Sequence, residues 1–195
     1  MVAKKNKPPT TATKKELKVE QEIPLNSTTL PKAAFPIVGI GASAGGLAAF
    51  EAFFAAMPAD KEINMAFVLV QHLAPDHKSI LTELLQRHTF MPVLAVEDGV
   101  IVKPNHVYII PPDRDMAFMH GSLQLLKPVI PRGHRFPIDF LFRSLALDLG
   151  AKAIVIILSG TGTDGTLGMR EIKAEGGMAI VQSITSSEFS GMPQS

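Results

Sequence analysis

The chain has 195 residues, of which 46% are hydrophobic, and this is enough to bury the core of one domain. Cysteine is absent, which excludes disulfides, a thiol nucleophile and a cysteine-ligated metal, and fits a cytoplasmic location. No apolar run approaches the roughly 20 residues that cross a bilayer, so we expect no membrane insertion.

The first 34 residues differ in composition from the rest. They hold seven lysines and three glutamates, are rich in Pro, Thr and Lys, and contain no aromatic residue. A basic tail can bind nucleic acid, but this one has no aromatic side chain on which bases could stack. We therefore interpret residues 1–34 as a disordered basic leader that binds no nucleic acid, and residues 35–195 as one domain.

From residue 35 onward, short apolar runs alternate with amphipathic segments, which is typical of βαβ units. Pro137 suits the first turn of a helix, and Gly176 and Gly177 end another. The pattern predicts an α/β fold with a doubly wound, mostly parallel, Rossmann-like sheet flanked by helices. We expect strands at 35–40, 65–70, 92–96, 106–110, 153–158 and 178–182, helices at 47–57, 80–88, 137–149 and 167–175, and a small β-hairpin at 116–126. No helix is expected after residue 182.

Ser43 follows the first predicted strand, within the segment Gly-Ala-Ser-Ala-Gly-Gly at 41–46. A sharp turn there exposes the hydroxyl, and the N-terminus of the next helix offers free N–H groups to an oxyanion. The spacing fits the Gly-x-Ser-x-Gly pattern of nucleophile elbows, but starting from Gly39 it also fits the dinucleotide-binding fingerprint. The turn alone leaves both interpretations open.

His72 and Asp164 follow two other predicted strands. Because the carboxyl ends of parallel strands share one edge of a sheet, both residues are expected on the same edge as Ser43. A histidine there can act as a general base and an aspartate can orient it. Taken singly, His72 could be an ordinary loop histidine or, with His77, a metal ligand, and Asp164 could cap the helix at 167–175.

Several segments, in this order, resemble the catalytic domain of CheB, the chemotaxis protein-glutamate methylesterase. The resemblance runs from about residue 35 to residue 193 and includes 37–46 (IVGIGASAGG), 70–72 (VQH), 97–99 (EDG), 108–112 (YIIPP) and 158–168 (LSGTGTDGTLG). It implies a Ser43–His72–Asp164 catalytic triad that hydrolyses glutamate γ-methyl esters, and also glutamine amides, on a methylated chemoreceptor-like protein. It implies no metal and no organic cofactor.

The same resemblance implies backbone oxyanion donors near Ala44 and Thr161, where the enteric pattern has threonine and methionine. It also implies that the basic residues Arg132, His134 and Arg135 receive acidic flanks of a receptor helix; a solvated basic loop is the alternative.

Two departures from the family concern the ends of the chain. The leader is too short for a receiver domain, and the family's sequence after the equivalent of residues 191–193 is missing. The amino-acid sequence is closest to the CheB segment of fusion proteins that also contain a CheR-type methyltransferase and PAS segments. We therefore expect this chain to be a fragment of such a protein. A non-catalytic regulatory or interaction module in a signalling fusion is the alternative function.

Overall fold

An apolar run, Ile37–Ala42, forms the central strand β1 of the computed structural model, which describes residues 1, 34–58, 62–72, 80–131 and 133–195. The other strands are β2 (Ala66–Gln71), β3 (Val93–Ala95), β4 (Val100–Ile101), β5 (His106–Ile109), β6 (Asp115–Met119), β7 (Ser122–Leu126), β8 (Ala153–Ile157) and β9 (Met178–Val181). The helices are α1 (Gly46–Ala55), α2 (Ile80–Gln86), α3 (Pro137–Leu149), α4 (Thr166–Ala174) and α5 (Gly191–Gln194), with a 3₁₀ turn at Gly150–Lys152.

Six strands form one parallel sheet in the order β3-β5-β2-β1-β8-β9. The chain moves from β1 to β2 in one direction and later returns to place β8 on the other side of β1. In open α/β sheets, sites lie at the carboxyl ends of the strands where the order reverses, so a site is expected beyond β1 and β8. The predicted fold class is confirmed, including the hairpin, which is β6 and β7.

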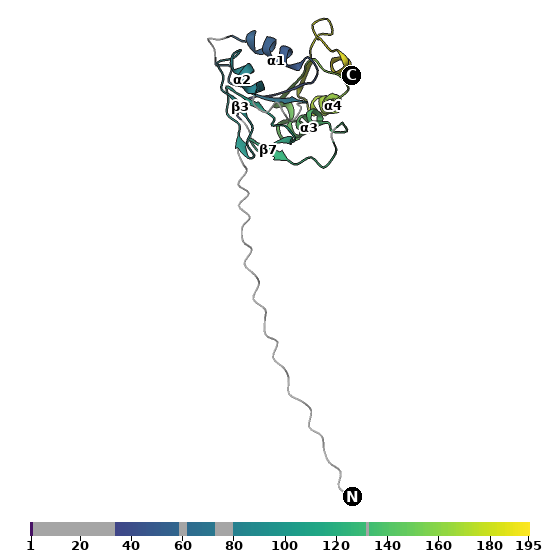
Figure 1. Cartoon of the computed structure of the whole chain (residues 1–195). Coiled ribbons are helices and arrows are strands. Elements are labelled where there is room, and N and C mark those ends of the chain that lie inside the picture. The colour runs from purple at the N-terminus through teal and green to yellow at the C-terminus, as the bar shows by residue number, and fades with distance from the viewer. Residues whose placement is uncertain (2–33, 59–61, 73–79, 132) are drawn as a thin grey trace.

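Alternate residues of the sheet face two separate hydrophobic cores. On one side, Phe50 and Phe54 of α1 pack with residues of α2 against Val38 and Ile40. On the other side, α3, α4 and the antiparallel sheet β4-β7-β6 cover Ile37 and its neighbours. Figure 1 shows α1 on one side of the sheet and α3 and β7 on the other. Coverage of both faces explains why the strands are continuously apolar rather than alternating.

Gly39 and Gly41 lie on the α3 side of β1, and their lack of a side chain lets α3 approach the sheet closely. A Cβ atom on Gly39 would lie 2.7 Å from Leu145 Cδ1, and one on Gly41 would overlap the Ile138 side chain. These two glycines of the dinucleotide-like fingerprint are therefore explained by helix packing, which weakens the nucleotide-binding interpretation of the turn.

Apart from shifts of one or two residues at other element ends, the structure differs from the prediction in three places. The two-residue strand β4 makes the expected hairpin a three-stranded sheet. After β9 the chain forms the single turn α5, which the sequence did not predict; buried Met192 and a hydrogen bond from its N–H to Gly160 O (2.9 Å) hold it in place. Strand β1 runs two residues beyond the predicted end, because Gly41 and Ala42 pair with β2.

Three sequence predictions fall on undescribed residues: the disordered leader at 1–34 lies almost wholly outside the described residues, as do His77 and Arg132. Within the part of the chain that is described, no helix has the length and apolar character needed to cross a membrane.

Candidate active site

Residues that directly follow β1, β2 and β8 meet at the carboxyl edge of the sheet. The loops after β1 and β8 are joined directly, since Ser43 N–H donates to Ser159 O (3.0 Å) and Leu158 N–H donates to Gly41 O (2.9 Å). Ser43 follows β1 and His72 follows β2, while Asp164 lies beyond the end of β8. The residues that the sequence predicted on one edge are therefore brought together.

The His72 imidazole lies between Ser43 and Asp164. Its Nε2 is 2.8 Å from Asp164 Oδ2, and its Nδ1 is 3.4 Å from Ser43 Oγ. Because an ionised carboxylate can only accept, the proton resides on Nε2, and Nδ1 is left with a lone pair facing the serine hydroxyl. The imidazole can thus accept the Ser43 proton. The 3.4 Å separation is long for a hydrogen bond, as is common in hydrolase sites without substrate.

Asp164 is held rigidly by backbone donors of α3. Its Oδ2 accepts the Ile138 N–H (3.0 Å) and its Oδ1 accepts the Asp139 N–H (2.9 Å), and the side chain is 4% exposed. The alternative prediction, that Asp164 caps its own following helix, is not what the structure has: Gly165 is the N-cap of α4, and the Asp164 carboxylate caps α3 instead. A carboxylate with this many fixed donors is suited to orient an imidazole.

The turn that carries Ser43 leads directly into α1. Gly45 is the N-cap residue and has a φ of 70°, which favours glycine. The N–H groups of Ala44 and Gly45 find no acceptor among the described residues, and they lie at the positive end of the α1 dipole. These groups are available to a developing oxyanion next to the Ser43 hydroxyl.

Ser159 fixes this turn, and the sequence did not single it out. It is 1% exposed; its hydroxyl donates to Ala44 O (2.8 Å) and accepts the Phe189 N–H (3.0 Å), while Gln182 Oε1 accepts its N–H (2.8 Å). A small polar residue directly after a buried strand was the available signal. Ser159 links the loop of Ser43 to the segment before α5.

Gly160 lies against the turn that carries Ser43, and its substitution is a first test of the site. A Cβ atom there would lie 3.0 Å from Ser43 Cβ and would overlap the sulfur of Met192. We expect Gly160→Ala to displace Ser43 and lower kcat for ester hydrolysis by roughly 100-fold, the effect of a misplacement of about 1 Å. Gly162→Ala cannot serve as the control, because Gly162 has a φ of 83° and alanine would be strained in that backbone conformation. The control is Ser186→Ala, an exposed serine that does not line the cavity beside His72 and whose hydroxyl donates to Ser183 O. Unchanged kcat in folded Gly160→Ala would contradict the close approach.

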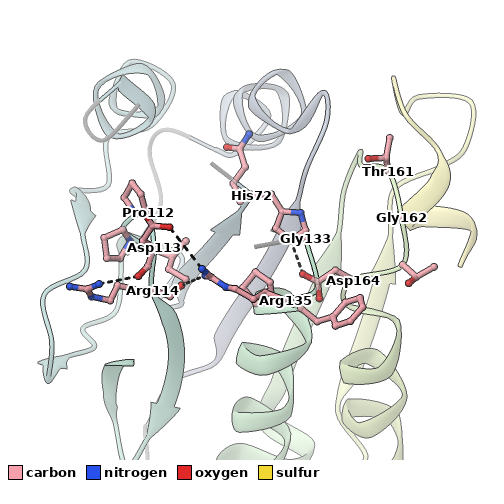
Figure 2. A pocket seen from close by; sticks show the side chains of 15 residues that line it. His72, Pro112, Asp113, Arg114, Gly133, Arg135, Thr161, Gly162 and Asp164 are labelled. Atoms are coloured by element: carbon pink, nitrogen blue, oxygen red, sulfur yellow. Dashed lines mark hydrogen bonds and ion pairs between the residues drawn. The ribbon is translucent and has the colours of Figure 1, made fainter. Parts of the chain in front are cut away.

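A cavity of about 410 Å³ opens beside the imidazole. Figure 2 shows His72 and Asp164 at its centre, Asp113 and Arg114 on one side, and Thr161 and Gly162 on the other. Ser43 is not among the lining residues, so a group bound in the cavity would reach the serine past the imidazole. Thr161 is exposed and lines the cavity, which is compatible with the expectation of a backbone donor there.

The basic residues predicted to bind substrate differ in their positions relative to the cavity. Arg135 lines the cavity, but its guanidinium pairs with Asp115 (3.3 Å) and Asp113 (3.9 Å) and donates to Arg114 O (3.1 Å), as Figure 2 shows in part. Much of its charge is thus matched within the protein, although its buried Nε–H has no acceptor in the described part of the chain. His134 is exposed and is not part of the cavity lining. Arg132 lies outside the described residues.

Comparison with known proteins connects this geometry to one family. The model of the CheB methylesterase family matches residues 38–195. A protein of Xanthomonas oryzae pv. oryzae named protein-glutamate methylesterase/protein-glutamine glutaminase 2 is 36% identical over 162 residues, covering 80% of this chain and 44% of that protein. An uncharacterized 104.1 kDa protein of Rhodobacter capsulatus is 42% identical over 115 residues, 59% of this chain and 12% of that protein. The chain therefore spans less than half the length of these relatives.

A solved structure agrees with the sequence comparison. The crystal structure of the Thermotoga maritima CheB methylesterase catalytic domain matches with a TM-score of 0.76 at 30% identity, covering 83% of this chain and 87% of that one. With the family model matched over nearly the whole described domain and the same fold in that catalytic domain, the chain belongs to the CheB methylesterase family.

Proposed function

We propose that this chain is a serine hydrolase that cleaves glutamate γ-methyl esters on a chemoreceptor-like protein, with Ser43 as nucleophile, His72 as base and Asp164 as orienting acid. The single observation that carries the proposal is the Ser43–His72–Asp164 arrangement, with 3.4 Å and 2.8 Å between successive polar atoms. The name of the Xanthomonas relative supports the ester substrate and adds glutamine amides as a second one.

The reaction follows from the positions of the polar atoms. Ser43 Oγ attacks the ester carbonyl carbon while His72 Nδ1 takes the hydroxyl proton, and Asp164 stabilises the resulting imidazolium. The oxyanion accepts hydrogen bonds from N–H groups at the start of α1, with Thr161 N–H as the expected second donor. The imidazolium then protonates the departing methoxide. Methanol leaves at this point, and the Ser43 acyl-enzyme remains. His72 Nδ1 then takes a proton from a water molecule that attacks the acyl-enzyme, and returns it to Ser43 Oγ as the glutamate carboxylate is released.

The proposal also includes the partner of this chain, its location and the longer protein to which it belongs. A methylated receptor helix is the partner, in the cytoplasm, and a CheR-type methyltransferase and PAS segments lie in the same longer protein. The match to only 12% of a 104.1 kDa protein supports a domain of this kind within a long chain. The intact arrangement of Ser43, His72 and Asp164 favours the enzyme over a purely regulatory module.

Methanol release tests the proposal. The chain should release methanol from a methylated receptor fragment and none from the unmethylated fragment. His72→Gln should reduce the rate by roughly 10²–10⁴-fold, because the serine proton then has no acceptor. The matched control is His120→Gln, since His120 is an exposed histidine that pairs with Asp148 on another part of the surface. Equal methanol release by His72→Gln and the unchanged chain would refute the proposal.

A further inference from the structure

Two helices begin side by side next to the candidate active site, and each is capped by a side chain from the other's loop or first turn. Neither Phe136 nor Gly165, the N-cap residues of α3 and α4, provides a side-chain cap. Asp164, which precedes α4, accepts two N–H groups of α3. In return Asp139, in the first turn of α3, accepts the Gly168 N–H of α4 through Oδ1 at 2.7 Å. The two aspartates therefore cap the helices reciprocally, and one of them is the aspartate that contacts His72.

The two helix starts are in close contact at glycine positions. A Cβ atom on Gly168 would lie 2.5 Å from Phe142 Cβ and 3.3 Å from the Cα and O atoms of Asp139. One on Gly165 would lie 3.0 Å from Ile138 Cγ2. The two helix starts therefore touch without an intervening side chain at these glycines. A shift of Gly168 relative to α3 would also shift Asp164, which lies four residues earlier in the chain.

Asp139 is an unusual residue in this environment because it is acidic and 6% exposed. Burial raises the pKa of its carboxyl, and the charge of Asp164 raises it further, while the Gly168 N–H, Arg143 and the Gly165 N–H oppose the rise. Arg143 itself pairs with Glu171 of α4 (3.0 Å). Asp115 and Arg135, which pair with each other, line a cavity of about 210 Å³ together with Asp139 and Arg143. A buried carboxylate that is repelled by its neighbour is costly to keep, so its hydrogen bond to α4 calls for a specific role.

We propose that Asp139 is a positioning residue for the ester hydrolysis: by accepting the Gly168 N–H it fixes the start of α4 and so holds the Asp164 carboxylate toward His72. This rests on the proposed function of the triad. Asp139 contacts neither His72 nor the expected substrate, and it acts through Asp164. What it supplies is an acceptor at one point in space, and its negative charge is not required for that.

The test separates the acceptor from the charge. Asp139→Asn keeps a carbonyl oxygen for the Gly168 N–H and removes the charge, whereas Asp139→Ala removes both. We expect Asp139→Ala to lower kcat for the methyl ester by roughly 100-fold with KM within twofold, as a slight misplacement of a catalytic group does. Asp139→Asn should retain kcat within about threefold, because the position of Asp164 is kept. Glu171→Gln is the control, since it removes another link between α3 and α4, the exposed pair with Arg143, and should leave kcat and KM unchanged.

A spectroscopic readout makes the test independent of turnover. In protein labelled with ¹⁵N-histidine, the Nε2–H resonance of His72 should be present and downfield in the unchanged chain and in Asp139→Asn. It should broaden or vanish through exchange with water in Asp139→Ala, as the Asp164 acceptor moves away. If Asp139→Ala fails to fold, Asp139→Leu replaces it, with the same branched shape and no acceptor.

The outcomes are distinguishable. Full kcat and an unchanged resonance in folded Asp139→Ala would overturn the positioning role. Equal losses in the alanine and asparagine variants would show that the charge matters instead of the acceptor, which also overturns it. If the unchanged chain releases no methanol, the proposed function fails, while the resonance comparison still decides whether Asp139 positions Asp164.

Discussion

Ser43→Ala should abolish methanol release from a methylated receptor fragment, with kcat/KM lower by about 10⁶-fold, the loss that follows removal of the nucleophile of a serine hydrolase. Without Oγ no acyl-enzyme can form, and water in its place lacks the fixed position of the hydroxyl. The fold should not suffer, because within the described ranges the Ser43 hydroxyl has no hydrogen-bond partner besides His72 (3.4 Å), and the Ser43 backbone N–H still donates to Ser159 O.

The measurement is methanol released per folded molecule, with circular dichroism as the check on folding. Ser122→Ala is the matched control: this serine lies in β7, where its hydroxyl donates to Met119 O, and its loss should leave the rate unchanged. An electrophilic phosphonate adds a second readout, since it should label the unchanged chain on Ser43 and fail to label the alanine variant. Activity retained in Ser43→Ala would exclude the serine-hydrolase mechanism.

Asp164→Asn should lower kcat by roughly 10³–10⁴-fold and also destabilise the protein by about 1–3 kcal/mol. In the native protein both carboxylate oxygens accept N–H groups of α3, and Oδ2 also accepts from His72. Asparagine has one acceptor oxygen, so in either orientation its amide N–H faces a donor. If that donor is His72, the imidazole adopts the wrong tautomer; in both cases the imidazolium loses its counter-charge.

Urea unfolding and methanol release measured on the same samples test both parts. Asp148→Asn is the control, because Asp148 also pairs with a histidine, His120 at 3.3 Å, but in another part of the molecule. It should leave kcat unchanged whatever it does to stability. A rate within tenfold of the unchanged chain in Asp164→Asn would contradict the role of Asp164 as the orienting acid.

The sequence predicted well those helices and strands that are marked by a local residue pattern. The strands β1, β2 and β8 are continuous apolar runs, and Pro137 marks the start of α3, so these elements could be located to within one or two residues. Strand β4 could not be found, because it has two residues and is defined by pairing with β7 more than 20 positions later. The single turn α5 depends on Met192 packing into a core formed by distant elements.

The candidate site could be predicted in part, because the topology of a parallel sheet limits where the residues after each strand can lie. Parallel strands place their following residues on one edge, which was enough to bring Ser43, His72 and Asp164 together. Asp139 gave no such signal, since an aspartate in the first turn of a helix is ordinary, and its burial and its contact with Gly168 of α4 arise from tertiary packing. Arg135 appeared to be a free basic residue, because its partner Asp115 lies 20 positions away in β6.

The contacts that join Ser43, His72 and Asp164 span 29 and 92 positions of the chain. Contacts between residues so far apart close large loops, and folding transition states form them slowly. No fragment ending before β8 contains all three groups, and the aspartate is aligned only when α3 and α4 have docked. We therefore expect methanol release to recover late during refolding, after early collapse, and to report the completely folded state.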